Sequence, residues 1–180
     1  MPQDYSAWLR RHRRNIGIPL VVAAFALSRF DETYLLPGIL LVAFGEALRF
    51  WAAGHLRKDQ TLTTGGPYRL IRNPLYLGSF FMAVGFCLIA GSVWVWILVL
   101  LYFVLCYIPV IRYEERTLRE KFGEEFARYS SLVPAFYPTV RMYPFSNSRF
   151  SFQQAMKNKE YNAVLGILAA FGILILLRRW

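Results

Sequence analysis

The sequence predicts an all-α fold, a polytopic helical bundle of about five membrane segments. Its 180 residues are 56% hydrophobic, whereas soluble domains are about 45–50% apolar. Between Arg72 and Arg112 lie 39 residues without Asp, Glu, Lys or Arg. One spanning helix needs about 20 apolar residues, so this stretch holds two helices and a tight turn, which we place at Gly91-Ser92. The length allows one domain, residues 1–180.

Uncharged runs define the five segments in order. They cover residues 15–30, 34–56, 74–90, 93–111 and 161–177. Helices are the default because lipid cannot satisfy open backbone groups. The first run follows a basic stretch and looks like the start of a signal peptide, but we expect an uncleaved span. The last run either crosses the membrane or is re-entrant.

The distribution of Lys and Arg predicts the orientation. Four arginines precede the first segment, and residues 112–159 supply nine more basic side chains on the same side. We assign this side to the cytosol of a prokaryotic inner membrane, with the endoplasmic reticulum as the alternative. Arg29 lies on the opposite side, as do Arg178 and Arg179 if the last segment crosses. Topology therefore explains the net charge of +10, and we expect membrane lipids rather than nucleic acid as partners.

The chain after the fourth segment predicts an amphipathic cytosolic helix. Five apolar residues share one face at helical spacing: Ile111, Leu118, Phe122, Phe126 and Tyr129. Such a helix lies on the membrane surface or caps the bundle. Val133-Pro134 and Tyr137-Pro138 end it, and residues 141–149 form an irregular connector.

The first motif runs from Thr64 to Gly78 and reads TGGPYRLIRNPLYLG. Its glycines and first proline predict a turn, and Asn73 and Pro74 suit the N-cap and first position of a helix. These features alone explain the motif structurally. A helix start beside Arg69 and Arg72 is also a site for a carboxylate or phosphate, and Gly78 lets a ligand or helix approach closely.

The second motif begins with Glu114-Glu115, at the exit of the fourth segment. The pair is either a solvated helix end balanced by Arg112 and Arg116, or a site for a cationic ligand or a base. Glu46 and Arg49, three residues apart in the second segment, share a helix face. We expect a mutual salt bridge there, with Arg49 kept as a substrate candidate.

The cysteines and histidines predict no metal site. Cys87 and Cys106 lie inside apolar segments, where they are expected to pack rather than form a disulfide. His12 and His55 lack the paired spacing of metal ligands.

Taken together, the two motifs resemble the isoprenylcysteine carboxyl methyltransferase family and its relatives, the phospholipid methyltransferases. The family pattern is G-x-Y-x-x-x-R-H-P-x-Y-x-G, then two helices, then E-E-x-x-L-x-x-x-F-G-x-x-Y-x-x-Y and V-P-x-x-x-P. The resemblance covers residues 64–138, the motif-bearing core of the domain. Two positions depart from it: the family histidine is Asn73, which cannot carry a proton charge, and the first tyrosine after Phe-Gly is Phe126.

The resemblance implies S-adenosylmethionine as cofactor, held between the two motifs at the cytosolic interface. It implies these cofactor-binding residues: Gly66, Tyr68, Arg72, Asn73, Pro74, Tyr76, Gly78, Glu114 and Glu115. Arg72 and Glu115 are the implied catalytic residues, and Arg49 and Tyr129 are the substrate candidates. Because a helical hairpin returns the chain to the same side, we expect the two motifs to be neighbours.

The implied function is methyl transfer to a lipophilic acceptor. The acceptor stays open between a prenylated thioether carboxylate, a phospholipid amine and a small thiol. One alternative is an NADPH-dependent membrane reductase of the sterol type, which looks similar in its C-terminal region. The other alternative is a non-catalytic membrane scaffold, in which the motifs only cap helices.

Overall fold

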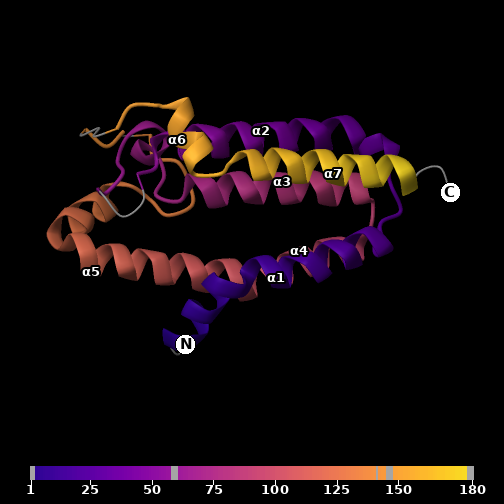
Figure 1. Ribbon diagram of the computed structural model, residues 1–180, viewed down its shortest axis with the longest axis horizontal. Helices are drawn as coiled ribbons and strands as arrows, with labels where there is room; N and C mark the ends of the chain where they lie inside the picture. Colours follow the sequence, from indigo (N-terminus) through magenta and orange to yellow (C-terminus); the bar gives the residue numbers. More distant parts are fainter. Residues whose placement is uncertain (1–2, 58–60, 141, 145–147, 178–180) are drawn as a thin grey trace. The chain divides into compact units, whose positions relative to one another are not determined.

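The computed structural model describes residues 3–57, 61–140, 142–144 and 148–177, and in these ranges it contains helices, turns and loops but no strand (Figure 1). The predicted all-α class is confirmed. Lys58 and Arg141, which we assign to the cytosolic side, and Arg178 and Arg179, which we assign to the opposite side if the last segment crosses, lie outside the described residues. Two compact units divide the chain, residues 1–42 with 83–117 and residues 43–82 with 118–180.

The first unit contains α1 (Gln3–Leu27), α4 (Val93–Tyr102) and the adjoining parts of α2 (Leu35–His55), α3 (Pro74–Ala90) and α5 (Ile108–Leu132). The predicted turn at Gly91-Ser92 is confirmed, because α3 ends at Ala90 and α4 begins at Val93. The loop after α1 is fixed to this end of α3. The N–H groups of Arg29 and Asp31 donate to the carbonyls of Ala90 (2.8 Å) and Ile89 (3.0 Å).

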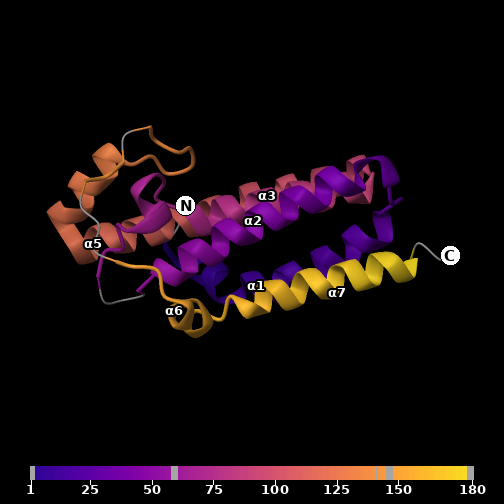
Figure 2. The same ribbon diagram turned by 90° about the horizontal axis from the view of Figure 1, so that it is seen from above.

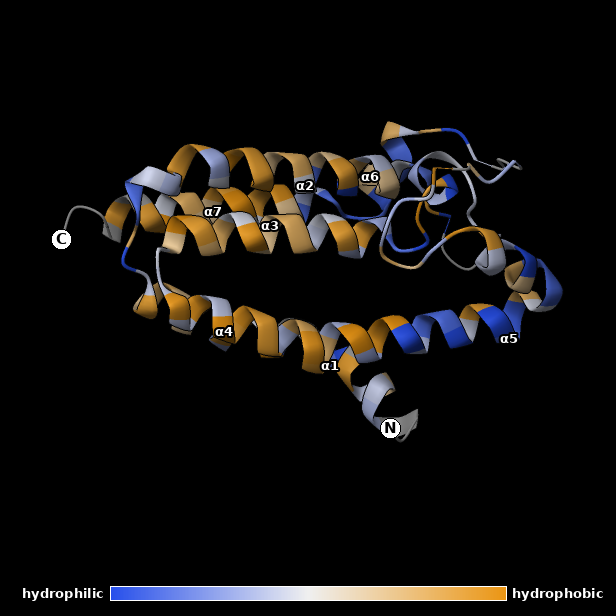
Figure 3. Ribbon diagram, turned by 180° about the vertical axis from the view of Figure 1, so that it is seen from behind, coloured by the Kyte–Doolittle hydropathy of each residue, from blue (hydrophilic) through white to orange (hydrophobic). Residues whose placement is uncertain are grey.

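The fourth apolar segment runs without a loop into the predicted amphipathic helix, which corrects the expectation of two separate elements. A π-helical turn, Phe103–Tyr107, joins α4 to α5. Pro109 has no N–H to donate to the carbonyl of Leu105, and this carbonyl instead lies 3.4 Å from the hydroxyl of Tyr5. Figure 3 shows the change from the apolar α4 to the hydrophilic α5 along this stretch.

The second unit contains the C-terminal part of α2, the start of α3, the end of α5, and α6 (Phe152–Lys157) with α7 (Tyr161–Leu177). Figure 2 shows α6 leading into α7. Its core near the motifs is a cluster of buried residues: Leu62, Phe126, Tyr129, Val133 and Tyr143. Leu118 and Phe122 pack against this cluster. The predicted apolar face of α5 from Leu118 onward is therefore confirmed.

A break within α5 lets this face reach the cluster. Gly123 has φ 48° and ψ −119°, which is not helical, and positive φ is readily adopted by glycine. The helix ends at Leu132, just before Val133-Pro134, as predicted.

Two stretches of the described chain are long and apolar enough to cross a membrane, Glu32–His55 and Val93–Leu132. Three shorter apolar helices cover Asn15–Leu27, Pro74–Ala90 and Tyr161–Leu174. Each of the five predicted segments thus contains a helix, but the first helix begins at Gln3, before the basic stretch, and ends at Leu27 rather than at residue 30. A membrane crossing by each of them stays a prediction.

Candidate functional site

The first motif folds as a 3-10 turn, Gly66–Arg69, followed by the start of α3. Tyr68 is buried, and its carbonyl accepts a hydrogen bond from the Tyr129 hydroxyl at 2.7 Å. Arg69 donates from Nε to the carbonyl of Tyr143 at 2.8 Å, and its own carbonyl accepts from the Tyr143 N–H at 3.0 Å. The turn is therefore held by Tyr129, at the end of the second motif, and by Tyr143, which follows that motif.

Arg72 joins the start of α3 to the end of α5. Its Nη1 donates to the carbonyls of Ser130 (2.8 Å) and Val133 (3.1 Å), and its backbone N–H donates to the carbonyl of Pro134 (2.9 Å). The last carbonyls of a helix have no partner within the helix, and a cation there also interacts favourably with the helix dipole. Arg72 therefore caps α5, a structural role that the sequence interpretation did not include.

Asn73 and Pro74 lie where the sequence places them. Pro74 is the first residue of α3, and the carbonyl of Asn73 accepts from the N–H groups of Tyr76 (3.1 Å) and Leu77 (3.0 Å). The side-chain amide of Asn73 donates to the carbonyl of Ala135 at 3.2 Å. The predicted helix start is confirmed, and the residue in place of the family histidine helps to hold the V-P-x-x-x-P segment.

Gly78 is a point of close approach between α3 and α2. A Cβ on Gly78 would lie 2.5 Å from the carbonyl oxygen of Gly45, and a Cβ on Gly45 would lie 2.5 Å from the carbonyl oxygen of Gly78. The stem of Arg49 also lies over Gly78, since its Cγ would be 2.6 Å from the added Cβ. Of the two close approaches proposed for Gly78, the structure shows that of a helix.

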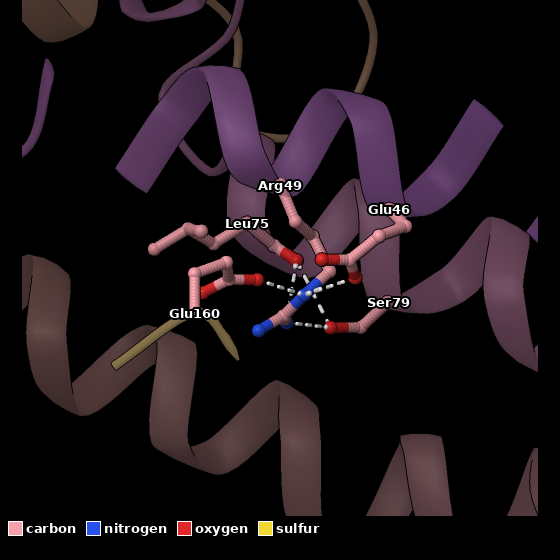
Figure 4. A network of polar contacts seen from close by, with 5 residues as sticks. All are labelled: Glu46, Arg49, Leu75, Ser79 and Glu160. Carbon is pink, nitrogen blue, oxygen red and sulfur yellow. Dashed lines mark hydrogen bonds and ion pairs between the residues drawn. The ribbon is translucent and has the colours of Figure 1, made fainter. Parts of the chain in front are cut away.

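Arg49 is the centre of a polar network in the second unit (Figure 4). Its Nε lies 2.7 Å from Oε1 of Glu160 and 3.9 Å from Oε2 of Glu46. Its Nη1 donates to the Ser79 hydroxyl and to the Leu75 carbonyl. The expected pair of Glu46 and Arg49 is present, but the stronger ion pair is with Glu160.

Glu160 is the network residue that sequence reasoning missed. It directly precedes α7, it is 5% exposed, and it follows Lys159, whose φ of 61° turns the chain. Its position immediately before the apolar run of α7 was the one sign in the sequence that could have pointed to it. Because the Arg49 Nε lies 2.7 Å from Glu160 but 3.9 Å from Glu46, Arg49 pairs mainly with Glu160.

Tyr129, a substrate candidate, belongs to the buried core. It is 2% exposed and stacks edge-on against Phe126 and Tyr143. Phe126, which replaces the family tyrosine, is also 2% exposed. A phenyl ring suits this apolar position because it has no hydroxyl to satisfy.

Glu114 and Glu115 lie half-buried on α5 within the first unit, whereas Arg72 and Asn73 belong to the second. The end of the second motif does reach the first, since the Tyr129 hydroxyl donates to the Tyr68 carbonyl. The structure does not test whether Glu114-Glu115 lies beside Arg72-Asn73. That neighbourhood, and the assignment of these residues to a cofactor, stay predictions.

The short helix α6 was not predicted, and it covers the end of α2. Asn158 donates from Nδ2 to the carbonyls of Ala53 and Leu56, both at 2.8 Å. Gln154 donates from Nε2 to the carbonyl of Leu56 at 2.8 Å, and the Ser151 N–H donates to the carbonyl of Gly54 at 3.0 Å. These contacts satisfy carbonyls that a helix end leaves open.

Comparison with known proteins identifies relatives of two kinds. The chain is 38% identical over 150 residues to the cobalt-zinc-cadmium resistance protein CzcN of Cupriavidus metallidurans, covering 76% of this chain and 68% of that protein. It is 34% identical over 156 residues to the nickel-cobalt-cadmium resistance protein NccN of Alcaligenes xylosoxydans xylosoxydans, covering 79% and 72%.

The second kind is a methyltransferase. Human protein-S-isoprenylcysteine O-methyltransferase is 28% identical over 156 residues, which cover 76% of this chain and 50% of the human protein. No solved structure matches significantly. The phospholipid methyltransferase family matches residues 33–125, more than half of the chain and both motifs up to Glu125. The chain therefore belongs to the phospholipid methyltransferase family.

Proposed function

We propose that this protein transfers a methyl group from S-adenosylmethionine to a lipophilic acceptor at the cytosolic face of a membrane. The observation that carries the proposal is the family match over residues 33–125, which includes the first motif and Glu114-Glu115. The built structure around the first motif supports it. The turn 66–69 and the start of α3 are tied to the end of α5 by Arg72 and Tyr129, and to the connector at Tyr143 by Arg69.

The chemistry of these residues fits the cofactor. S-Adenosylmethionine supplies an activated methyl group on a sulfonium and carries a carboxylate and an ammonium. The start of α3 with Arg72 suits the carboxylate, because helix N-termini and guanidinium groups favour anions. Glu114 or Glu115 suits the ammonium, and their assignment requires the two motifs to meet.

Holding two reactants in line is the main task of such a site, and good orientation is worth about 7–11 kcal/mol of the barrier. The fixed turn and the capped end of α5 provide rigid elements for that task. A site with little water also favours a reaction in which opposite charges disappear. Entry from the lipid side between helices would admit an acceptor with a prenyl or acyl chain.

The test is incubation of the purified protein with methyl-labelled S-adenosylmethionine and a total lipid extract. We expect saturable binding and one labelled lipid class, with both reduced at least tenfold in Arg72→Gln and Glu115→Gln. Glu120→Gln, an exposed change on the same helix, is the matched control. Absence of binding at millimolar cofactor, together with parental behaviour of Glu115→Gln, would reject the proposal.

The same assay separates the alternatives. Reduction of a sterol-type substrate with NADPH, without methyl transfer, would favour the reductase. Weak sensitivity of binding and methyl transfer to substitutions of Arg72 and Glu114 would favour the scaffold, in which the motif residues only cap helices.

The similarity to two metal-resistance proteins suggests that the reaction takes place in cells exposed to toxic metal ions. No group of three His, Cys, Asp or Glu side chains in the described part of the chain is placed to hold a metal ion. From the family match, we propose that a contribution to metal tolerance would act through methylation. Growth in cobalt, zinc or cadmium of cells that carry the parent or Glu115→Gln tests this link, and equal tolerance would reject it.

A further inference from the structure

We infer that His55 supplies the imidazole of the methyl-transfer site and that its Nε2 accepts the proton of an amine or thiol acceptor. This inference rests on the proposed function. Its starting point is a contact between His55, at the end of α2, and Gly66, the first residue of the G-x-Y-x-x-x-R motif. A Cβ on Gly66 would lie 2.5–2.6 Å from Cε1, Nδ1 and Nε2 of the imidazole.

The contact makes the ring part of the motif turn. Gly66 has φ 56°, a conformation that suits glycine, and the imidazole occupies the space where a side chain would lie. The other ring contacts are aromatic: Trp51 at 6.3 Å and Phe150 at 5.9 Å between centroids. His55 is 6% exposed, so the ring is held against the turn rather than free in solvent.

One hydrogen bond fixes the tautomer. Nδ1 lies 3.0 Å from the carbonyl oxygen of Trp51, and a carbonyl only accepts, so Nδ1 carries the hydrogen. In the neutral ring Nε2 then has a free lone pair. Among the described residues Nε2 has no hydrogen-bond partner, which leaves it able to accept a proton.

The His55 imidazole would also replace the one that the family pattern has at position 73, where this chain has asparagine. The family pattern has a histidine at that position, whereas the Asn73 amide here donates to the carbonyl of Ala135. His55 belongs to the same unit and contacts the same motif. In the proton step the acceptor's N–H or S–H bond breaks, the proton moves to Nε2, and the electron pair stays on the atom that takes the methyl group. Such proton transfer contributes about 10²–10⁴-fold.

Substitutions separate this role from packing. His55→Asn keeps a donor for the Trp51 carbonyl and removes Nε2. We expect a lower unfolding temperature, because the smaller side chain leaves space over Gly66. In the folded protein the affinity for S-adenosylmethionine should stay near the parent, while turnover falls at least 100-fold. Asn73→His added to His55→Asn should recover at least tenfold, because it restores an imidazole to the motif. His12→Asn, which changes the histidine of the first unit, is the matched control.

Chemical footprinting supplies a readout apart from activity. Diethyl pyrocarbonate modifies neutral imidazoles, and mass spectrometry locates the adduct. We expect His55 to be modified in the free protein and protected by S-adenosylhomocysteine, with His12 unaffected by that ligand.

Three results would overturn the inference: parental turnover in His55→Asn, no modification of His55 in the free protein, or a methyl ester as the product, since a carboxylate has no proton to give up. Failure of the proposed function looks different, because the parent protein itself would then neither bind nor use S-adenosylmethionine.

Discussion

Arg72 belongs to the first motif and also stabilises the fold. Its guanidinium holds the carbonyls of Ser130 and Val133, which fixes a positive charge beside the start of α3. A charge fixed in this way is preorganised, so it loses little freedom when an anionic group binds. Structural and cofactor roles for Arg72 are therefore compatible.

The polar network predicts unequal effects of its members. Arg49→Gln leaves the buried Glu160 without its cation, and breaking a buried pair from one side costs about 3–5 kcal/mol. Glu46→Gln should cost less than Arg49→Gln, because the Glu46 carboxylate is 3.9 Å from the Arg49 Nε whereas the Glu160 carboxylate is 2.7 Å from it. Thermal unfolding in detergent measures both, and equal losses would contradict the assignment of Glu160 as the main partner.

At the scale of the element, α2 and α3 depend on glycine at their crossing. Gly45→Ala and Gly78→Ala each place a Cβ 2.5 Å from a backbone oxygen of the other helix. We expect each to destabilise the protein by about 1–3 kcal/mol through overpacking, as measured by thermal unfolding.

Gly172→Ala on α7 is the matched control, because nothing lies within 4 Å of its added Cβ. Alanine favours helix over glycine by about 1 kcal/mol, so this variant should be neutral or slightly more stable. A loss as large as that of Gly45→Ala would show that helix crossing is not the cause.

The helix α6 makes a prediction of its own. Asn158→Ala removes two hydrogen bonds to the end of α2, each worth about 0.5–1.5 kcal/mol. We expect a lower unfolding temperature and faster proteolysis after α2. Asn162→Ala, an exposed change four residues on, should leave both unchanged, and similar effects of the two variants would reject a capping role for α6.

At the scale of the whole molecule, the Lys and Arg distribution predicts which loops face the cytosol. In a protein with Cys87 and Cys106 replaced by alanine, Thr61→Cys should react with a membrane-impermeant maleimide only after the cells are opened. Glu32→Cys should react in intact cells. Both positions are exposed. The reverse pattern would invert the topology and place the motifs outside.

The sequence alone determined that the five apolar segments are helical, and it determined the limits of the first motif. Uncharged runs, proline at the first helical position and an Asn-Pro start are local signals, and the structure has α3 beginning at Pro74 and α4 at Val93 as predicted. The apolar spacing of Leu118, Phe122, Phe126 and Tyr129 likewise identified the face that packs in the core. These features depend on residues a few positions apart.

Only the tertiary structure decided which groups the polar side chains contact. Arg49 pairs with Glu160 across 111 positions, Arg72 caps α5, and the ring of His55 lies on Gly66. In the sequence, a charged side chain or an imidazole has several equally suitable partners. Helix packing and turn geometry select one of them. For the same reason α6 escaped prediction, because its six residues are placed by carbonyls at the end of α2. Local periodicity therefore sets the elements, and long-range packing sets the site.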